Sequence, residues 1–252
     1  MKCTSWKTLD EGKILLARLN QPKANVLDAA MIGELNQGLQ EKVNKGIRAV
    51  VLSHEGPHFS FGASVPEHTA ENAPAMLDSF HGLFKAIHQL SVPVLAAVGG
   101  QCLGGGFELA SFCHLLFCSP QSKFGQPEIL LGVFPPMASL ILNIKAPGLA
   151  DEINLTGRTF SAQEFQSAGL INCIDENPEQ AALDFAAKHF VPKSAISVRH
   201  AVRANRWRFD KALNDELPRL EAQYLDELMK TRDANEGIGA FMEKRTPEWT
   251  DD

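Results

Sequence analysis

Short runs of branched apolar residues predict a sheet in the first half of the chain. KILLARL (residues 13–19) and IRAVVLS (47–53) have the length and side-chain types of strands. VPVLAAV (92–98) is apolar throughout, which is typical of a strand that is buried on both faces. HLLFCS (114–119) has the same character. The pattern therefore predicts strands that are spread over about 120 residues.

Two amphipathic patterns lie between these runs and predict helices that pack on the sheet. Met31, Leu35 and Leu39 recur at four-residue steps after Asp28, which is a suitable N-cap. A second apolar stripe runs through residues 74–90. Strands and helices thus alternate, and we expect an α/β fold in which most neighbouring strands are parallel.

Helical patterns dominate after about residue 135. Ser161 and Glu164 have the spacing of a capping box, which marks the start of a short helix. Longer helical patterns follow at the residue ranges 178–189, 193–207, 210–230 and 233–244. We expect an α/β core over residues 1–190 and a helical region over residues 191–252.

Composition narrows the classes of function. The chain has 252 residues and a formal net charge of −6, so no sequence-wide footprint for nucleic acid is present. No apolar run approaches the roughly 20 residues of a membrane span, and the first residues lack a signal-peptide pattern. The five cysteines form no C-x-x-C pair, which favours reduced thiols. We expect a soluble cytoplasmic protein.

The stretch QCLGGGFELA (101–110) indicates a site for an oxygen anion. A helix that begins at these glycines leaves backbone N–H groups free, and a ligand oxygen can approach them closely. Glu108 lies three residues after Gly105 and shares its helical face. The dinucleotide-binding and P-loop motifs both fail here, because Leu109 replaces the last glycine and no G-K-[ST] follows. A tightly packed strand-to-helix turn without chemistry is the alternative.

A second acid and a second turn extend this hypothesis. Glu128 follows Pro127 and precedes apolar residues, so we expect partial burial and a raised pKa, with a solvated loop acid as the alternative. Two carboxyl groups in different surroundings can divide the roles of acid and base. Ala63 lies in a turn of small residues whose N–H groups are candidates for completing an oxyanion hole; an ordinary loop is the alternative.

Taken together, these stretches resemble the enoyl-CoA hydratase/isomerase family, also called the crotonase family. The resemblance covers nearly the whole chain. It rests on LNQPKANVLD (19–28), FSFGAS (59–64), AAVGGQCLGGGFELA (96–110), FGQPEILLGVFP (124–135), LTGRTFSAQEFQSAGLI (155–171) and EGIGAFMEKRTPEW (236–249). It implies a crotonase-like spiral of ββα units with a C-terminal helical region that mediates trimerisation.

The resemblance implies an acyl-CoA thioester substrate, with coenzyme A as part of the substrate and no separate cofactor or metal. The thioester oxygen would be held by the backbone N–H groups of Ala63 and Gly105. Glu108 and Glu128 match the family's two glutamates, which handle the water molecule and the proton at carbon. The two acids are consistent with general acid–base chemistry.

The resemblance also implies contacts with coenzyme A and with further copies of the chain. Lys23 and Ala24 match positions near the CoA phosphates. Phe241 and Lys244 match positions that in some relatives reach the CoA of a neighbouring subunit. The alternatives are surface lysines and a core aromatic residue. We expect a homotrimer or homohexamer, with no nucleic acid or membrane as partner.

Departures from the common family pattern bear on the substrate. Ser64 and Pro66 stand where aspartate and lysine occur in relatives, and FPPMAS (134–139) replaces a glycine-rich run that lines the acyl pocket. These features look most like the cyclohexa-1,5-diene-1-carbonyl-CoA hydratases of anaerobic aromatic degradation. The alternatives are a general short-chain enoyl-CoA hydratase, an enoyl-CoA isomerase, another crotonase reaction such as decarboxylation, and a non-catalytic binding protein with this fold.

Overall fold

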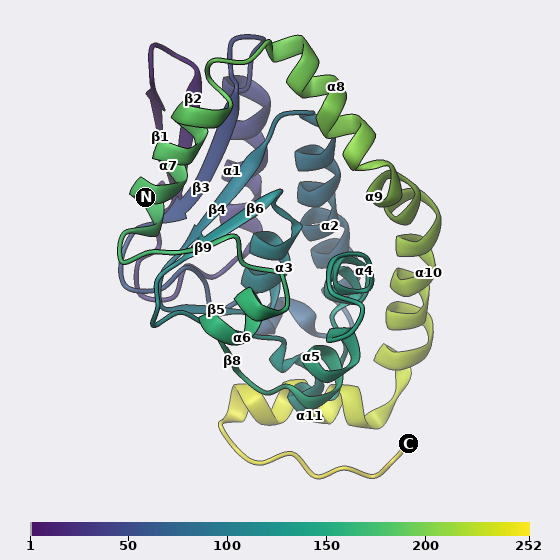
Figure 1. Ribbon diagram of the computed structural model, residues 1–252. Coiled ribbons are helices and arrows are strands. Elements are labelled where there is room, and N and C mark those ends of the chain that lie inside the picture. Colours follow the sequence, from purple (N-terminus) through teal and green to yellow (C-terminus); the bar gives the residue numbers. More distant parts are fainter. Residues whose placement is uncertain (1) are drawn as a thin grey trace.

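The apolar runs form a six-stranded sheet in the computed structural model, which describes residues 2–252 (Figure 1). Its order is β1-β2-β3-β4-β6-β9, and only the β1–β2 pair is antiparallel. A smaller sheet has the order β5-β7-β8. The strands are β1 (Thr4–Leu9), β2 (Ile14–Leu19), β3 (Ala49–His54), β4 (Val94–Val98), β5 (Gln101–Leu103), β6 (Leu115–Cys118), β7 (Lys123–Gly125), β8 (Phe160–Ser161) and β9 (Cys173–Ile174).

The four predicted strands are confirmed as β2, β3, β4 and β6, and their parallel pairing is confirmed as well. Every residue of β4 is buried, as its uninterrupted apolar sequence predicts. The remaining strands were not predicted. Most of them are two or three residues long, too short for a pattern of alternating residues to stand out.

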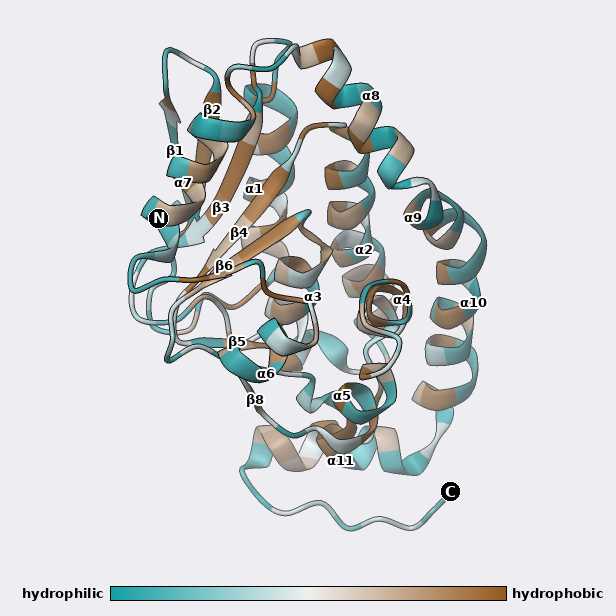
Figure 2. Cartoon of the chain, viewed as in Figure 1, coloured by the Kyte–Doolittle hydropathy of each residue, from teal (hydrophilic) through white to brown (hydrophobic). Residues whose placement is uncertain are grey.

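Helices cover both faces of the large sheet, and the alternation of side chains along each strand explains why. Ile14 and Leu16 of β2 belong to an apolar cluster that includes Ala182 of α7 (Pro178–His189). Leu15 and Ala17 belong to the larger cluster on the opposite face, with residues of α1 (Ala29–Lys42), α2 (Ala73–Gln89) and α3 (Gly105–Phe112). Figure 2 shows β3, β4 and β6 as almost uniformly hydrophobic, which is the composition that a doubly covered sheet requires.

The predicted helices are present, and their start signals work as the sequence indicates. The Asp28 side chain accepts a hydrogen bond of 2.8 Å from the Met31 N–H, and the Ser161–Glu164 capping box is complete. The helices are α1 (Ala29–Lys42), α2 (Ala73–Gln89), α3 (Gly105–Phe112), α4 (Pro136–Lys145), α5 (Ala150–Thr156), α6 (Ala162–Ser167), α7 (Pro178–His189), α8 (Ala195–Asn205), α9 (Trp207–Lys211), α10 (Leu217–Ala222) and α11 (Arg232–Glu243).

The pattern over residues 210–230 predicts one regular helix, and the structure corrects this. Two π-helical turns, Ala212–Glu216 and Gln223–Glu227, flank α10. Pro218 offers one physical reason, because a proline has no N–H to continue the regular hydrogen-bond pattern. Figure 1 shows this irregular helix running alongside α2 and α4, and α11 crossing the end of the molecule below them.

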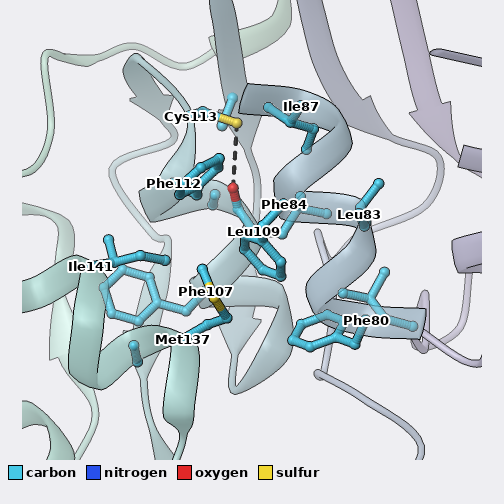
Figure 3. Packing of buried hydrophobic residues seen from close by; sticks show 14 of the residues in the cluster. Phe80, Leu83, Phe84, Ile87, Phe107, Leu109, Phe112, Cys113, Met137 and Ile141 are labelled. Atoms are coloured by element: carbon cyan, nitrogen blue, oxygen red, sulfur yellow. Dashed lines mark hydrogen bonds between the residues drawn. The ribbon is translucent and has the colours of Figure 1, made fainter. Parts of the chain in front are cut away.

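An aromatic cluster joins the helices that carry the candidate site. The Phe80 and Phe84 rings of α2 lie 5.0 Å apart edge to face, and Phe84 meets Phe112 of α3 at 5.2 Å. Figure 3 shows these rings beside Phe107 and Met137, so that α2, α3 and α4 share one core. This packing holds α3 between α2 and α4, and the aromatic pairs add to the free energy gained by burying their area.

The loop before α1 is fastened to the loop after β3 by one buried side chain. Asn25 donates hydrogen bonds from Nδ2 to Glu55 O (3.0 Å) and His58 O (2.9 Å), while its Oδ1 accepts from the Gln21 N–H. Its own carbonyl accepts from the Ser60 hydroxyl at 2.7 Å.

Within residues 2–252 no helix combines the length and apolar character needed to cross a bilayer.

We expect Asn25→Ala to lower the free energy of unfolding by about 2–4 kcal/mol. The substitution orphans two carbonyls and one N–H, and it places alanine at a φ of 44°. Asn143→Ala is the control, because Asn143 is exposed and its effect should stay within about 0.5 kcal/mol. Urea unfolding measures both; equal effects in the two variants would refute the role given to Asn25.

Candidate active site

Two loops that are far apart in the sequence meet at the start of α3. Isolated bridges pair Ser60 with Cys102 and Leu27 with Ala63. The Leu27 N–H donates to Gly62 O at 2.9 Å, and the Leu103 N–H donates to Ser60 O at 3.0 Å. These backbone contacts bring the turn after β3 against the glycine turn, as the site hypothesis requires.

The three consecutive glycines are explained by three different neighbours. A Cβ at Gly104, whose φ is 51°, would lie 2.7 Å from Glu128 Oε1. A Cβ at Gly105 would lie 2.9 Å from the Phe80 ring and 3.2 Å from the Ala63 nitrogen. A Cβ at Gly106 would lie 2.6 Å from the side chain of Ser60. Each position therefore excludes a side chain, and the glycines serve close packing as well as access to the backbone.

The candidate oxyanion hole consists of the backbone N–H groups of Ala63 and Gly105, which lie side by side. Neither N–H has a hydrogen-bond partner within residues 2–252. Gly105 is the first residue of α3, so its N–H also lies at the positive end of the helix dipole. The arrangement provides two free donors for an oxygen that carries negative charge.

Glu108 is buried in the first turn of α3, with only 4% of its surface exposed. Its Oε1 accepts a hydrogen bond of 2.7 Å from the Ala138 N–H at the start of α4. Burial raises the pKa of Glu108 to about 7, although hydrogen bonds from the N–H groups of Ala138 and Met137 oppose the shift. This carboxyl group can therefore exchange a proton near neutral pH.

Glu128 lies on the 3₁₀ turn Pro127–Leu131 that follows β7. The residue is partly exposed, but its carboxyl group points inward to the backbone of Gly104. The buried Gln126 amide, oriented with its nitrogen toward Glu128, donates to Oε2 at 3.0 Å. Burial first, and then the charge of Glu108, raises the pKa of Glu128 well above its usual range, as the sequence predicts for a partly buried acid.

A small cavity joins all four predicted catalytic residues, and the structure thus brings Ala63, Gly105, Glu108 and Glu128 together. Its free volume is about 20 Å³, roughly the space of one water molecule. The other lining residues come mainly from α2, the segment before α4 and the C-terminal helix: His68, Met76, Leu77, Phe80, His81, Val133, Phe134, Pro135, Pro136 and Tyr224.

Pro135 and Pro136 line the cavity as expected from FPPMAS, whereas Met137 does not: it is fully buried beside Phe107 (Figure 3). The sequence analysis missed His81 and Tyr224. His81 follows Phe80 on the predicted stripe of α2, so its place on that helix was the available signal. Tyr224 carried no signal, since it lies in a π-helical turn and reaches the cavity through the tertiary fold alone.

The residues predicted to contact coenzyme A do not line this cavity. Lys23 is exposed and Ala24 half-buried in the loop before α1, where Ala24 O accepts a hydrogen bond from the Phe61 N–H at 2.9 Å. Phe241 is 54% exposed near the end of α11, and Lys244 caps that helix with a left-handed conformation. The prediction for these four residues remains a prediction.

The positions of the remaining histidine, cysteine and acidic side chains in the fold decide whether they can form a metal site or a disulfide. In the part of the chain that the structure describes, no three His, Cys, Asp or Glu side chains gather as metal ligands. The five cysteines are free thiols, and four of them are buried. Burial raises the pKa of Cys113 to about 11 and that of Cys118 to about 12, so both stay protonated at neutral pH.

Residues 10–252 match the protein family described as enoyl-CoA hydratase/isomerase. The chain is 46% identical over 241 residues to the cyclohexa-1,5-dienecarbonyl-CoA hydratase of Thauera aromatica, covering 95% of this chain and 93% of that protein. It is 32% identical to the 2,3-dehydroadipyl-CoA hydratase of Escherichia coli K12, over 95% and 96% of the two chains. A crystal structure of an enoyl-CoA hydratase from Mycobacterium avium is similar, with a TM-score of 0.84, 29% identity and coverage of 98% and 99%.

The burial of Glu108 makes a prediction about stability and pH. Because its folded pKa of about 7 lies above its unfolded value, the native state binds more protons than the unfolded state between about pH 4.5 and 7, and stability falls over that range. We expect Glu108→Gln to raise the Tm at pH 8 by a few degrees. In a chain of this size, each kcal/mol of added unfolding free energy raises the Tm by about 2–4 °C. At pH 4.5 the two proteins should have nearly the same Tm.

Thermal unfolding at both pH values and one fixed protein concentration measures this difference. Glu41→Gln is the matched control, since Glu41 is exposed on α1 and its substitution should leave the Tm within about a degree or two at either pH. A Glu108→Gln variant with the same Tm difference at pH 4.5 and pH 8 would contradict the raised pKa.

Proposed function

This chain belongs to the enoyl-CoA hydratase/isomerase family, and from that premise we propose that it adds water to an α,β-unsaturated acyl-CoA thioester. One observation carries the proposal: two inward-pointing carboxyl groups share a cavity with two backbone N–H groups that have no partner in the part of the chain that the structure describes. The free donors suit a carbonyl oxygen that becomes negative, and the acids suit the addition of a hydroxyl group and a proton.

In the proposed reaction the thioester oxygen binds the N–H groups of Ala63 and Gly105. Addition of water to the conjugated double bond places negative charge on this oxygen as an enolate. The two donors are fixed by the backbone before the reaction, so they stabilise the charge without having to reorient. Loss of one such donor typically lowers a rate by about 10²–10³.

Glu108 and Glu128 are proposed to divide the acid and base roles. Both are buried and the charge of one raises the pKa of the other, which favours a state in which the pair holds one proton. The ionised carboxylate takes a proton from water as its oxygen bonds to carbon. The protonated carboxyl group gives its proton to the enolate carbon, and the sum is one water molecule added.

We propose cyclohexa-1,5-diene-1-carbonyl-CoA as the substrate, in the degradation of aromatic compounds. Support comes from the 46% identity to the Thauera aromatica hydratase, well above the 32% shared with the Escherichia coli hydratase. Pro135 and Pro136 add a rigid wall beside the two glutamates, which suits a cyclic group with few conformations. A general short-chain enoyl-CoA hydratase is the second candidate, because several relatives described as probable enoyl-CoA hydratases are 29–33% identical over nearly the full chain.

Coenzyme A is proposed to enter as part of the substrate, without a separate cofactor, and to be bound near Lys23 and Ala24. Phe241 and Lys244 are proposed to reach the coenzyme A of a neighbouring copy in a homotrimer or homohexamer, with residues 191–252 at the contact. Exposed apolar side chains on α11 support this assembly, among them Phe241 and Met242. The free thiols suit the reducing cytoplasm.

Hydration of a panel of CoA thioesters tests the proposal, with product formation followed by chromatography as the readout for every substrate. We expect the cyclic diene to react with a higher kcat/KM than linear crotonyl-CoA. Faster turnover of crotonyl-CoA would instead favour the general hydratase. No turnover of any thioester, together with normal binding of coenzyme A, would favour a binding protein with this fold.

Glu108→Gln and Glu128→Gln should each lower the hydration rate by about 10²–10⁴ while the protein remains folded. Glutamine keeps the size and the hydrogen-bond acceptor of the side chain but cannot exchange a proton. Glu41→Gln is again the matched control and should react at the wild-type rate. Steady-state kinetics and circular dichroism check the variants; a wild-type rate in either one would remove that glutamate from the reaction.

A further inference from the structure

Two polar atoms on the wall of the catalytic cavity lack a hydrogen-bond partner within residues 2–252. They are the hydroxyl of Tyr224 and Nε2 of His81, and both are buried. Most buried polar groups in folded proteins are hydrogen-bonded, and an orphaned one lowers stability. Two orphans that line one cavity with Glu108 and Glu128 therefore point to a bound polar group.

His81 is held in one orientation by a residue of α10. Its Nδ1 lies 2.7 Å from Glu221 Oε1 of α10, and only 1% of His81 is exposed. The contact lowers the pKa of Glu221, which therefore stays ionised and accepts the hydrogen bond. We assign the ring proton to Nδ1 on this ground, which leaves Nε2 to act as a hydrogen-bond acceptor.

Tyr224 complements His81 as a donor. It is the only tyrosine of the chain, it is 1% exposed, and it lies in the π-helical turn Gln223–Glu227. Burial, with the charges of Glu128 and Glu108, raises its pKa, so the phenol keeps its proton. Single π-helical turns occur frequently at functional sites. Tyr224 and His81 thus add to the cavity one donor and one acceptor that have no partner among the described residues.

We propose that Tyr224 and His81 bind the oxygen atom that the reaction adds: the water before the addition and the hydroxyl group of the product after it. A water or alcohol oxygen accepts from the Tyr224 hydroxyl and donates to His81 Nε2. The remaining proton of the water is the one that the carboxylate takes. This inference rests on the proposed hydration and names the residues that position its water.

The free volume supports this assignment. About 20 Å³ accommodates one water molecule, and a site for water needs two to four polar partners. Tyr224, His81 and the two glutamates supply that number from the same lining. His68 also lines the cavity, but its Nδ1 lies 2.9 Å from Ser64 O, so that ring nitrogen is already occupied.

Tyr224→Phe separates this role from a structural one. If the hydroxyl binds nothing, its removal deletes an orphaned polar group, so the Tm stays constant or rises and the kinetics do not change. If it positions the added oxygen, kcat/KM for hydration falls at least about tenfold with the same or a higher Tm. The inhibition constant of the hydroxylated product should rise about tenfold as well, while that of a saturated acyl-CoA without a hydroxyl stays constant.

His81→Gln is the second variant, and His88→Gln is its matched control. His88 lies seven residues further along α2 and contacts Asp210 at 3.2 Å, and its Nδ1 also lacks a partner among the described residues, but it does not line the cavity. We expect His81→Gln to weaken product binding and lower kcat about tenfold or more, and His88→Gln to preserve both.

The outcomes distinguish failure of the proposed hydration from failure of the roles given to Tyr224 and His81. A wild-type protein that hydrates no thioester overturns the proposed function and this inference together. An active wild-type protein whose Tyr224→Phe and His81→Gln variants keep wild-type kcat and product affinity overturns this inference alone. Equal losses of affinity for the hydroxylated and the saturated acyl-CoA would also overturn it, because the contact would then not involve the hydroxyl group.

Discussion

Close approach between two segments of backbone is the constraint on which the site depends. A Cβ at Gly62 would lie 3.0 Å from Leu103 O and 3.3 Å from the Gly105 nitrogen, and a Cβ at Gly105 would lie 3.2 Å from the Ala63 nitrogen. Only glycine, which has no side chain, allows the two backbone segments to approach this closely. The contact aligns two N–H groups that have no hydrogen-bond partner among the described residues.

Burial of the two acids follows from the same arrangement. α3 starts at the glycine turn and carries Glu108 into the core, where the start of α4 supplies the Ala138 N–H as its partner. The turn that carries Glu128 lies against Gly104. Two carboxyl groups that share a low-dielectric cavity resist ionising together. Burial raises both pKa values, and the charge of Glu108 raises the pKa of Glu128 further.

The C-terminal helical region closes the cavity and gives it polar character. Glu221 orients His81 from α10, and Tyr224 lines the cavity from the adjoining π-helical turn. The backbone N–H groups of Ala63 and Gly105 and the two acids come from the α/β core, whereas Glu221 and Tyr224 come from the helical region.

Sequence alone determined the elements that local physics governs. The strands β2, β3, β4 and β6 followed from continuous apolar runs, and the caps at Asp28 and Ser161 followed from side chains that bond to nearby N–H groups. Glycine turns and acids in ordered motifs also predicted that Glu108, Glu128, Gly105 and Ala63 share one site, and the structure places these four residues around one cavity.

Only the tertiary structure decided which distant residues meet. Tyr224 and Glu221 lie more than 90 residues from Glu128, and no periodicity relates them to it. The short strands β8 and β9 and the π-helical turns exist because neighbouring segments and Pro218 impose them, rather than because of local propensity. Met137 was expected at the acyl pocket and lies in the core instead, since the rotation of α4 is set by packing against Phe107. Long-range packing is a property of the whole chain, and short motifs do not encode it.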